Sequence, residues 1–438
     1  MKIVYLTAGA AGMFCGSCMH DNALAKALRR EGADCLLQPL YTPIRTDESS
    51  VADTHVFFGG VNIYLLDKVP LFRFVPAFLK RLLDRPGFLA WATRRAGSTD
   101  AKLLGDLTLS MLSGEAGNQA EEVTRLVAWL RDEIRPDAIL FTNLLIAGVI
   151  PAIRRELPQA KLVAILQGDD AFLDHLPSPY REQAEGRIGE LGRQCDAIVV
   201  NSIRYGESMA RRLGLDAARL KLLPLTIDTA PFRDFVPKHQ RDAGSGIIRI
   251  GYFARIAPEK GLHNLIDAFI DLCGRPGCEE VRLDFAGWLG EQNRGYLEEQ
   301  LSKLERAGLG DRAAYLGSPD LRGKLAMLGE LDLFSVPTSH EEPKGLSVLE
   351  ALAAGVPVVL PAKGAFPELV ESTGGGLLVD PDDPHALADG LYRLVRDPES
   401  RRRLGRIGRE HVMTRRGVEA QARQMIEMLG TQSPSPST

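Results

Sequence analysis

Residues 340–370 read HEEPKGLSVLEALAAGVPVVLPAKGAFPELV. The pattern predicts a loop, a helix over 347–354, a glycine that ends the helix and a buried strand over 356–360. A helix that begins after such a loop offers its first backbone N–H groups to an anion. Glu342 precedes the helix and Glu350 lies one turn inside it, so both carboxylates can accept hydrogen bonds from hydroxyl groups. An anion cradle with two hydroxyl-binding carboxylates suits a nucleotide sugar.

A second charged cluster follows the strand predicted over 248–253. Residues 252–261 read YFARIAPEKG, which places Arg255 and Lys260 at the carboxyl end of that strand. Two fixed cations there can hold a diphosphate and stabilise its charge as it departs, without a metal. Cations after a strand are usually only solvent-exposed, so this cluster gains weight from lying in the same half as Glu342 and Glu350.

Predicted strands and helices alternate along most of the chain, which predicts parallel sheets covered on both faces. The rhythm breaks at the polar stretch 233–246 and then restarts. We therefore predict an α/β protein with two doubly wound domains, 1–235 and 245–412. Ligands of such sheets bind beyond the carboxyl ends of the strands.

Several segments lie outside this pattern. Residues 41–118 look like an insertion, and its part 71–95 combines basic and aromatic residues. That part suits either contact with a membrane or an extended acceptor, or a packed helical hairpin with a solvated basic side. A helix predicted near 415–430 can pack back on the N-terminal domain, and the tail 431–438 is predicted to be disordered.

Composition excludes several classes of protein. The 438 residues carry a net charge of -4, without the basic excess of a nucleic-acid-binding protein. No apolar stretch reaches 18 residues, which argues against a membrane-spanning helix. Six cysteines suit a reducing cytoplasm. The C-x-x-C spacing of Cys15 and Cys18 fits structural thiols, with redox chemistry or half a metal site as alternatives.

Together these motifs resemble the retaining glycosyltransferases of the GT-B fold, specifically family 4. Glu342 and Glu350 match the E-x7-E motif of that family, and Arg255, Lys260 and Gly261 match its R-x4-K-G element. The resemblance is specific over 248–395 and weaker over 1–40 and 130–230. It implies two Rossmann-like domains facing a central cleft, with the acceptor on the N-terminal domain and the donor on the C-terminal one.

The resemblance also implies roles for individual residues. Arg255 and Lys260 bind the donor diphosphate, Glu342 contacts the transferred sugar, and Glu350 binds the ribose hydroxyls; the first three are the implied catalytic residues. A glycine of the first βα loop, Gly16 or Gly12, lets that loop approach the diphosphate. The implied donor-binding residues are Gly16, Arg255, Lys260, Glu342, Lys344, Gly345, Leu346, Ser347 and Glu350. The family needs no bound metal or cofactor, and the sequence has no obvious D-x-D-type site.

The sequence departs from the family at two informative places. Lys344 stands where relatives have an aromatic residue, and it either answers a charged donor sugar or points to solvent. Gln167, Asp169 and Asp170 stand where many relatives have a histidine, and we take them as acceptor-side candidates. Gln167 can hydrogen-bond a sugar but cannot carry a proton at neutral pH, whereas either aspartate can.

We therefore expect a metal-independent retaining glycosyltransferase. The donor is an NDP-sugar, and UDP-sugars are the commonest donors in the family. The acceptor is a hydroxyl of a carbohydrate, lipid or small molecule. Two alternatives stay open: an NDP-sugar epimerase or phosphorylase of the same fold, and a catalytically inactive sugar-binding protein. The expected location is the cytoplasm, and in the membrane-contact alternative 71–95 lies at the inner membrane face.

Overall fold

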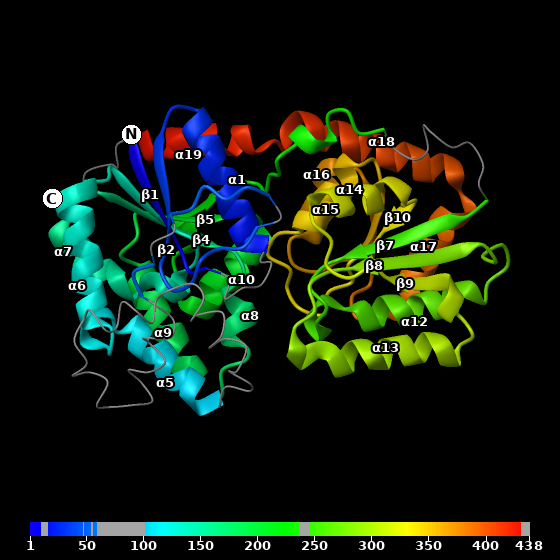
Figure 1. Ribbon diagram of the computed structural model, residues 1–438, viewed down its shortest axis with the longest axis horizontal. Helices are drawn as coiled ribbons and strands as arrows, with labels where there is room; N and C mark the ends of the chain where they lie inside the picture. Colours follow the sequence, from blue (N-terminus) through cyan, green and yellow to red (C-terminus); the bar gives the residue numbers. More distant parts are fainter. Residues whose placement is uncertain (10–15, 47, 54–55, 59–100, 237–245, 431–438) are drawn as a thin grey trace. The chain divides into compact units, whose positions relative to one another are not determined.

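The computed structural model describes residues 1–9, 16–46, 48–53, 56–58, 101–236 and 246–430. The chain divides into two compact units, one formed by 1–224 with 421–438 and the other by 225–420. Among the described residues, each unit contains one six-stranded sheet with helices packed on it (Figure 1). All strand pairs in the described part of the chain are parallel, so the predicted architecture of two doubly wound α/β domains is confirmed.

The first sheet has the strand order β2-β1-β3-β4-β5-β6. Its inner strands are apolar runs because helices cover both faces, and every residue of β3 is buried. The strands are β1 (Lys2–Thr7), β2 (Asp34–Pro39), β3 (Ala138–Phe141), β4 (Lys161–Leu166), β5 (Ala197–Val200) and β6 (Leu220–Leu222).

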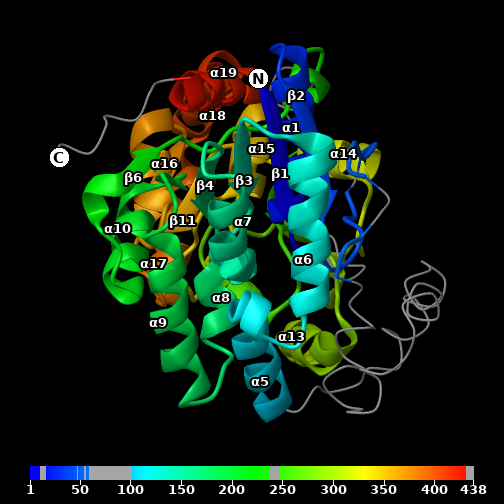
Figure 2. The ribbon, with the colours of Figure 1, turned by 90° about the vertical axis from the view of Figure 1, so that its left-hand side faces the viewer.

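Helices α6 and α7 cover one face of this sheet. Leu126 of α6 and Ile150 of α7 belong to the same buried cluster as Val4 and Ile139 of the strands, and Figure 2 views the unit from the side of these helices. The helices of the unit are α1 (Gly16–Arg30), α5 (Ala101–Leu112), α6 (Ala120–Trp129), α7 (Ile150–Glu156), α8 (Asp169–Leu173), α9 (Tyr180–Gly192), α10 (Ile203–Leu213) and α19 (Val418–Gly430).

Helix α19 connects the end of the described chain to the first unit. Gln421 is buried, and its Oε1 lies 2.8 Å from Nε2 of His20 on α1. At the surface, the guanidinium of Arg423 pairs with Glu31 at 2.7 Å. Residues 421–430 of α19 therefore pack against α1 in the first unit, although the two segments are far apart in the sequence.

The second sheet has the strand order β12-β11-β10-β7-β8-β9. Because β7 and β10 are neighbours at its centre, the chain winds outward in opposite directions from them, and the switch point lies at their carboxyl ends. The strands are β7 (Ile248–Phe253), β8 (Val281–Ala286), β9 (Ala313–Tyr315), β10 (Leu333–Phe334), β11 (Val358–Pro361) and β12 (Gly376–Val379).

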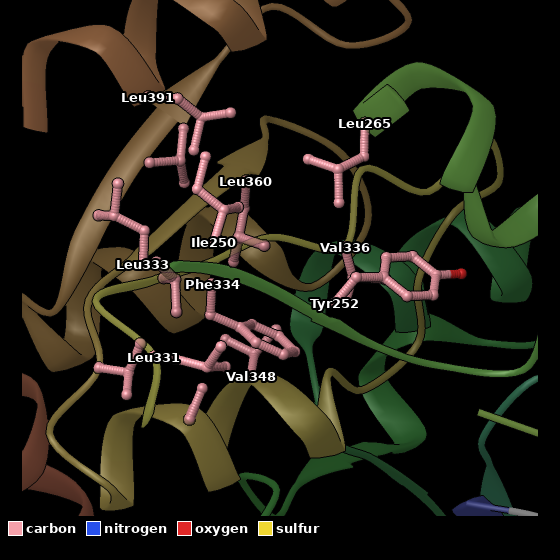
Figure 3. Close-up of a cluster of buried hydrophobic side chains, with 14 of the residues drawn as sticks. Ile250, Tyr252, Leu265, Leu331, Leu333, Phe334, Val336, Val348, Leu360 and Leu391 are labelled. Carbon is pink, nitrogen blue, oxygen red and sulfur yellow. The ribbon is translucent and has the colours of Figure 1, made fainter. Parts of the chain in front are cut away.

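The core of the second unit lies on both faces of this sheet. Ile250 and Tyr252 of β7 and Phe334 of β10 are fully buried, in one cluster with Val348 of α15 (Figure 3). The helices are α12 (Leu262–Cys273), α13 (Arg294–Arg306), α14 (Leu321–Glu330), α15 (Leu346–Ala353), α16 (Phe366–Thr373), α17 (Pro384–Arg396) and α18 (Pro398–Arg415).

Some predicted features differ or lie outside the described residues. The units divide after Pro224, ahead of the predicted boundary near 235, and most of the predicted linker (237–245) lies outside the described residues. The basic-aromatic segment 71–95, Gly12, Cys15 and the tail 431–438 also lie outside them. Helix α5, from the end of the predicted insertion, packs so tightly on α9 that a Cβ on Gly105 would lie 2.3 Å from the Tyr180 ring.

Two properties of the described residues bear on membrane and metal binding. None of the helices there is both long and apolar enough to cross a membrane. Within the same ranges, His, Cys, Asp and Glu nowhere gather in threes in a way that could hold a metal ion. Cys18 is buried in α1.

Candidate active site

The loop after β7 brings the two predicted cations to the carboxyl edge of the second sheet. Residues Pro258–Lys260 form a short 3₁₀ helix that ends at Gly261, whose φ is +72°. A Cβ on Gly261 would lie 1.7 Å from the carbonyl oxygen of Pro337, so this loop touches the segment after β10 where only glycine fits. The buried Tyr252 hydroxyl lies 3.3 Å from the carbonyl oxygens of both Arg255 and Lys260, and these contacts stabilise the loop.

Lys260 and Glu342 form an ion pair at this edge. The Lys260 Nζ lies 2.7 Å from Oε2 of Glu342. The other carboxylate oxygen of Glu342 faces the N–H groups of Lys344 and Gly345 at 3.4 and 3.3 Å. A carboxylate held by an ammonium and two backbone donors keeps one orientation, as a group that grips a sugar needs.

The charge of Glu342 is set by its neighbours. Burial of the carboxyl opposes ionisation, but the nearby charges of Lys260, His340 and Lys344 outweigh it and lower the pKa of Glu342 from 4.5 to about 2. Glu342 is therefore ionised over the whole neutral range, where it can accept hydrogen bonds but cannot donate one.

His340 joins this pair, and sequence reasoning did not single it out. Its Nδ1 donates to the carbonyl oxygen of Glu259 at 3.0 Å. That Nε2 lies 3.5 Å from the Lys260 ammonium and 4.0 Å from Glu342. The only sequence signal was its place two residues before the first motif glutamate.

Arg255, the other predicted cation, is more exposed. Its guanidinium pairs with Glu259 four residues later, inside the same loop. Because about a third of the side chain is exposed, the pair is accessible to solvent, and an incoming diphosphate can compete for the guanidinium.

The helix that carries Glu350 begins one residue before the start that the sequence predicts. Helix α15 starts at Leu346, directly after Gly345, whose φ of +87° requires glycine. The first N–H groups of a helix have no intrahelical acceptor, so Leu346 and Ser347 present the donors that the sequence predicts for a phosphate or sugar. Glu350 itself is buried and paired with Lys324 of α14 at 2.6 Å, a partner that the sequence did not indicate.

The structure decides against one of the two alternatives for Lys344. The residue is only 6% exposed, so the alternative in which its side chain points to solvent is wrong. It lies close enough to Glu342 to lower the pKa of that carboxyl. A role toward a charged donor sugar stays a prediction.

In the first unit, the side chain of Gln167 links helix α1 to the loop that follows β3. Its Nε2 lies 2.8 Å from the carbonyl oxygen of Thr142 and 3.1 Å from Oδ1 of Asp21. Asp21 also accepts a hydrogen bond from the Tyr5 hydroxyl at 2.6 Å. This amide nitrogen therefore supports the fold directly, and the residue is buried. Gly16 is the first residue of α1, and a Cβ there would meet nothing within 4 Å.

The two predicted acceptor-side aspartates lie side by side at the start of α8 but differ in their partners. Asp170 accepts a hydrogen bond from the Tyr205 hydroxyl at 2.5 Å. Asp169 accepts one from the backbone N–H of Leu144 at 3.1 Å, while its Oδ2 is buried with no hydrogen-bond partner among the described residues. Burial, then the nearby charge of Asp170, raises the pKa of Asp169 from 3.8 to about 7. Near neutral pH this carboxyl can therefore gain or lose a proton.

This shift predicts a pH-dependent effect on stability. Between about pH 4 and pH 7 the folded protein keeps a proton on Asp169 that the unfolded chain loses, so stability falls as pH rises through this window. Asp169→Asn removes the titration. We expect its melting temperature to rise relative to wild type as the pH goes from 4 to 8, while the exposed-site control Asp106→Asn tracks wild type. A difference that stays constant with pH would contradict the assignment.

Comparison with known proteins identifies the family. Residues 238–411 match the family of glycosyl transferases group 1. A D-inositol 3-phosphate glycosyltransferase of Xylanimonas cellulosilytica is 30% identical over 304 residues, covering 64% of this chain and 68% of that protein. The chain belongs to the glycosyl transferases group 1 family. The protein of the same name from Corynebacterium glutamicum is 27% identical over 249 residues, which cover 54% of this chain and 59% of that protein, less than two thirds of its length.

Solved structures with a similar fold show the fold class of this family member. Sucrose-phosphate synthase from Thermosynechococcus elongatus superposes with a TM-score of 0.70 at 20% identity, over 98% of both chains. Anabaena HepE in complex with UDP-glucose gives a TM-score of 0.66 at 20% identity, over 99% of this chain and all of that one. The predicted GT-B fold with two Rossmann-like domains is confirmed.

Proposed function

We propose that this group 1 family member is a retaining, metal-independent glycosyltransferase that moves a sugar from a UDP-sugar to a hydroxyl acceptor. The observation that carries the proposal is the meeting of Lys260 and Glu342 at 2.7 Å beside the start of α15. Cations, a fixed carboxylate and helix N–H groups are then combined at one strand edge, which is the chemistry that a sugar diphosphate needs.

The residues of this edge divide the work of the reaction. As the bond from the sugar to the diphosphate breaks, positive charge develops on the sugar and negative charge on the leaving oxygen. Lys260 and Arg255 neutralise the leaving diphosphate, so no step depends on a metal ion. Glu342 holds the hydroxyls of the transferred sugar, and the leaving phosphate takes the proton of the acceptor hydroxyl on the same face.

The names of similar proteins narrow the substrates. HepE, which shares the fold, is described in complex with UDP and UDP-glucose, and this supports UDP as the nucleotide of the donor. The curated relatives are named for D-inositol 3-phosphate, which supports a hydroxyl of a polyol or sugar as the acceptor. In the first unit we propose Asp169, with its unfilled oxygen, as the acceptor-side group, and Gly16 as the point where the first loop approaches the donor.

The two motif carboxylates should give separable defects. Glu350→Gln is expected to weaken UDP binding about tenfold or more with a smaller change in kcat, because the ribose contact is present in ground and transition states alike. Glu342→Gln is expected to lower kcat at least tenfold while the UDP Kd changes little. Calorimetric titration with UDP and steady-state kinetics measure both.

The control for this pair is Glu371→Gln, an exposed position on α16, which should behave as wild type. Unchanged UDP affinity in Glu350→Gln would reject the ribose role. Full turnover in excess EDTA tests metal independence. Incubation with UDP-glucose and no acceptor tests the epimerase alternative, since an epimerised nucleotide sugar would contradict a transferase.

A further inference from the structure

Lys324 is a buried lysine that neither motif contains. Its side chain is only 3% exposed, on the helix α14, where the neighbouring buried residues Met327 and Leu328 are apolar. Lysine is almost never buried to this degree unless its charge is paired. The partner here is Glu350, with Nζ 2.6 Å from Oε1.

The ammonium also faces an aromatic ring. Its Nζ lies 5.6 Å from the ring centroid of Phe253, within the range of a cation–π contact. Phe253 is the last residue of β7, two positions before Arg255. Lys324 therefore joins three parts of the second unit: the helix α14, the strand end that leads into the diphosphate loop, and the helix that carries Glu350.

A pair this deeply buried is a poor device for stability alone. Removing an ammonium and a carboxylate from water costs several kcal/mol each, and apolar residues of similar size often serve a fold as well. An ion pair does provide what apolar residues cannot, which is a carboxylate fixed in orientation and kept charged. Glu350 is the residue to which we assign the ribose hydroxyls, so both properties bear on its acceptor strength.

We propose that Lys324 is a positioning residue for the nucleoside of the donor, acting through Glu350. It holds Oε1 of Glu350, so that the carboxylate presents a fixed, charged acceptor to the ribose. The proposal rests on the proposed role of Glu350. It predicts that Lys324 affects ligands that contain a ribose and leaves the diphosphate contacts of Arg255 and Lys260 unchanged.

Two probes separate these contributions: UDP, which carries the ribose, and inorganic pyrophosphate, which does not. Lys324→Met removes the charge at nearly the same volume, and we expect it to weaken UDP about tenfold while pyrophosphate affinity stays within twofold. In the Glu350→Gln background, the same substitution should change UDP affinity less than twofold, because the group it positions is already gone.

The chain offers a matched control. Lys303 of α13 pairs with Asp267 of α12 at 2.7 Å in the same unit, on a partly exposed surface. Lys303→Met also removes one lysine from one carboxylate, and it should leave both affinities within twofold of wild type. If Lys324→Met does not fold, the double variant Lys324→Met/Glu350→Gln, which buries no unpaired charge, is compared with Glu350→Gln alone.

Each outcome bears on one proposal. Unchanged UDP affinity in Glu350→Gln would reject the ribose role in the proposed function. A weakened Glu350→Gln together with a normal Lys324→Met would overturn the Lys324 proposal and leave the proposed function standing. Equal losses of UDP and pyrophosphate in Lys324→Met, or a further loss beyond twofold in the double variant, would also overturn it, because Lys324 would then act on the fold.

Discussion

Lys260→Met is expected to lower kcat by about 30- to 1000-fold, equivalent to roughly 2–4 kcal/mol of barrier. The ammonium lies at the carboxyl end of β7, where charge develops on the departing diphosphate. It also pairs with Glu342 at 2.7 Å, so its loss leaves a buried carboxylate without its nearest counter-charge. Turnover of a UDP-sugar by the purified variant, with circular dichroism to check folding, measures the effect.

A second variant separates the two contributions of Lys260. In Lys260→Met/Glu342→Gln, no unpaired carboxylate remains, so thermal stability should return toward the wild-type value while turnover stays low. Arg255→Gln, at the more exposed cation, should cause a smaller loss than Lys260→Met because solvent screens its charge. A folded Lys260→Met/Arg255→Gln variant with near-normal turnover would contradict the assignment of the donor cations.

Gly261→Ala is expected to destabilise the second unit by about 3 kcal/mol or more and to abolish most activity. A φ of +72° by itself costs a residue with a side chain roughly 1–2 kcal/mol. The added Cβ would also lie 1.7 Å from the carbonyl oxygen of Pro337. The loop after β7 must then move away from the segment after β10, and Lys260 moves with it.

Gly308→Ala provides the matched control for this substitution. Gly308 has a φ of +69°, but nothing lies within 4 Å of the position that its Cβ would take. The control should therefore show the conformational cost alone, about 1–2 kcal/mol, with activity retained. Urea unfolding and turnover compare the two variants. Equal losses in both would mean that the contact with Pro337 does not constrain the loop.

The sequence by itself was sufficient to predict the helices and strands around the donor motifs and the position of those motifs in the chain. The strand predicted over 248–253 is β7, and the helix predicted over 347–354 is α15, displaced by one residue. Hydrophobic periodicity and glycine positions are local, so they are readable without a fold. The alternation of strands and helices likewise predicts parallel sheets, whose carboxyl ends gather Arg255, Lys260 and the residues around Glu342 at one edge.

Only the tertiary structure determined the partners of these residues. Lys324 and Glu350 are 26 positions apart, and Gln167 lies 146 positions from Asp21, yet both are direct contacts. The burial of Lys344 was equally hidden, because its neighbours in sequence are a proline and a glycine. The physical reason is that a side chain's partner depends on how separate strand ends and helices pack, and no local pattern records that packing. Local periodicity therefore places the elements, and their packing selects which charges meet.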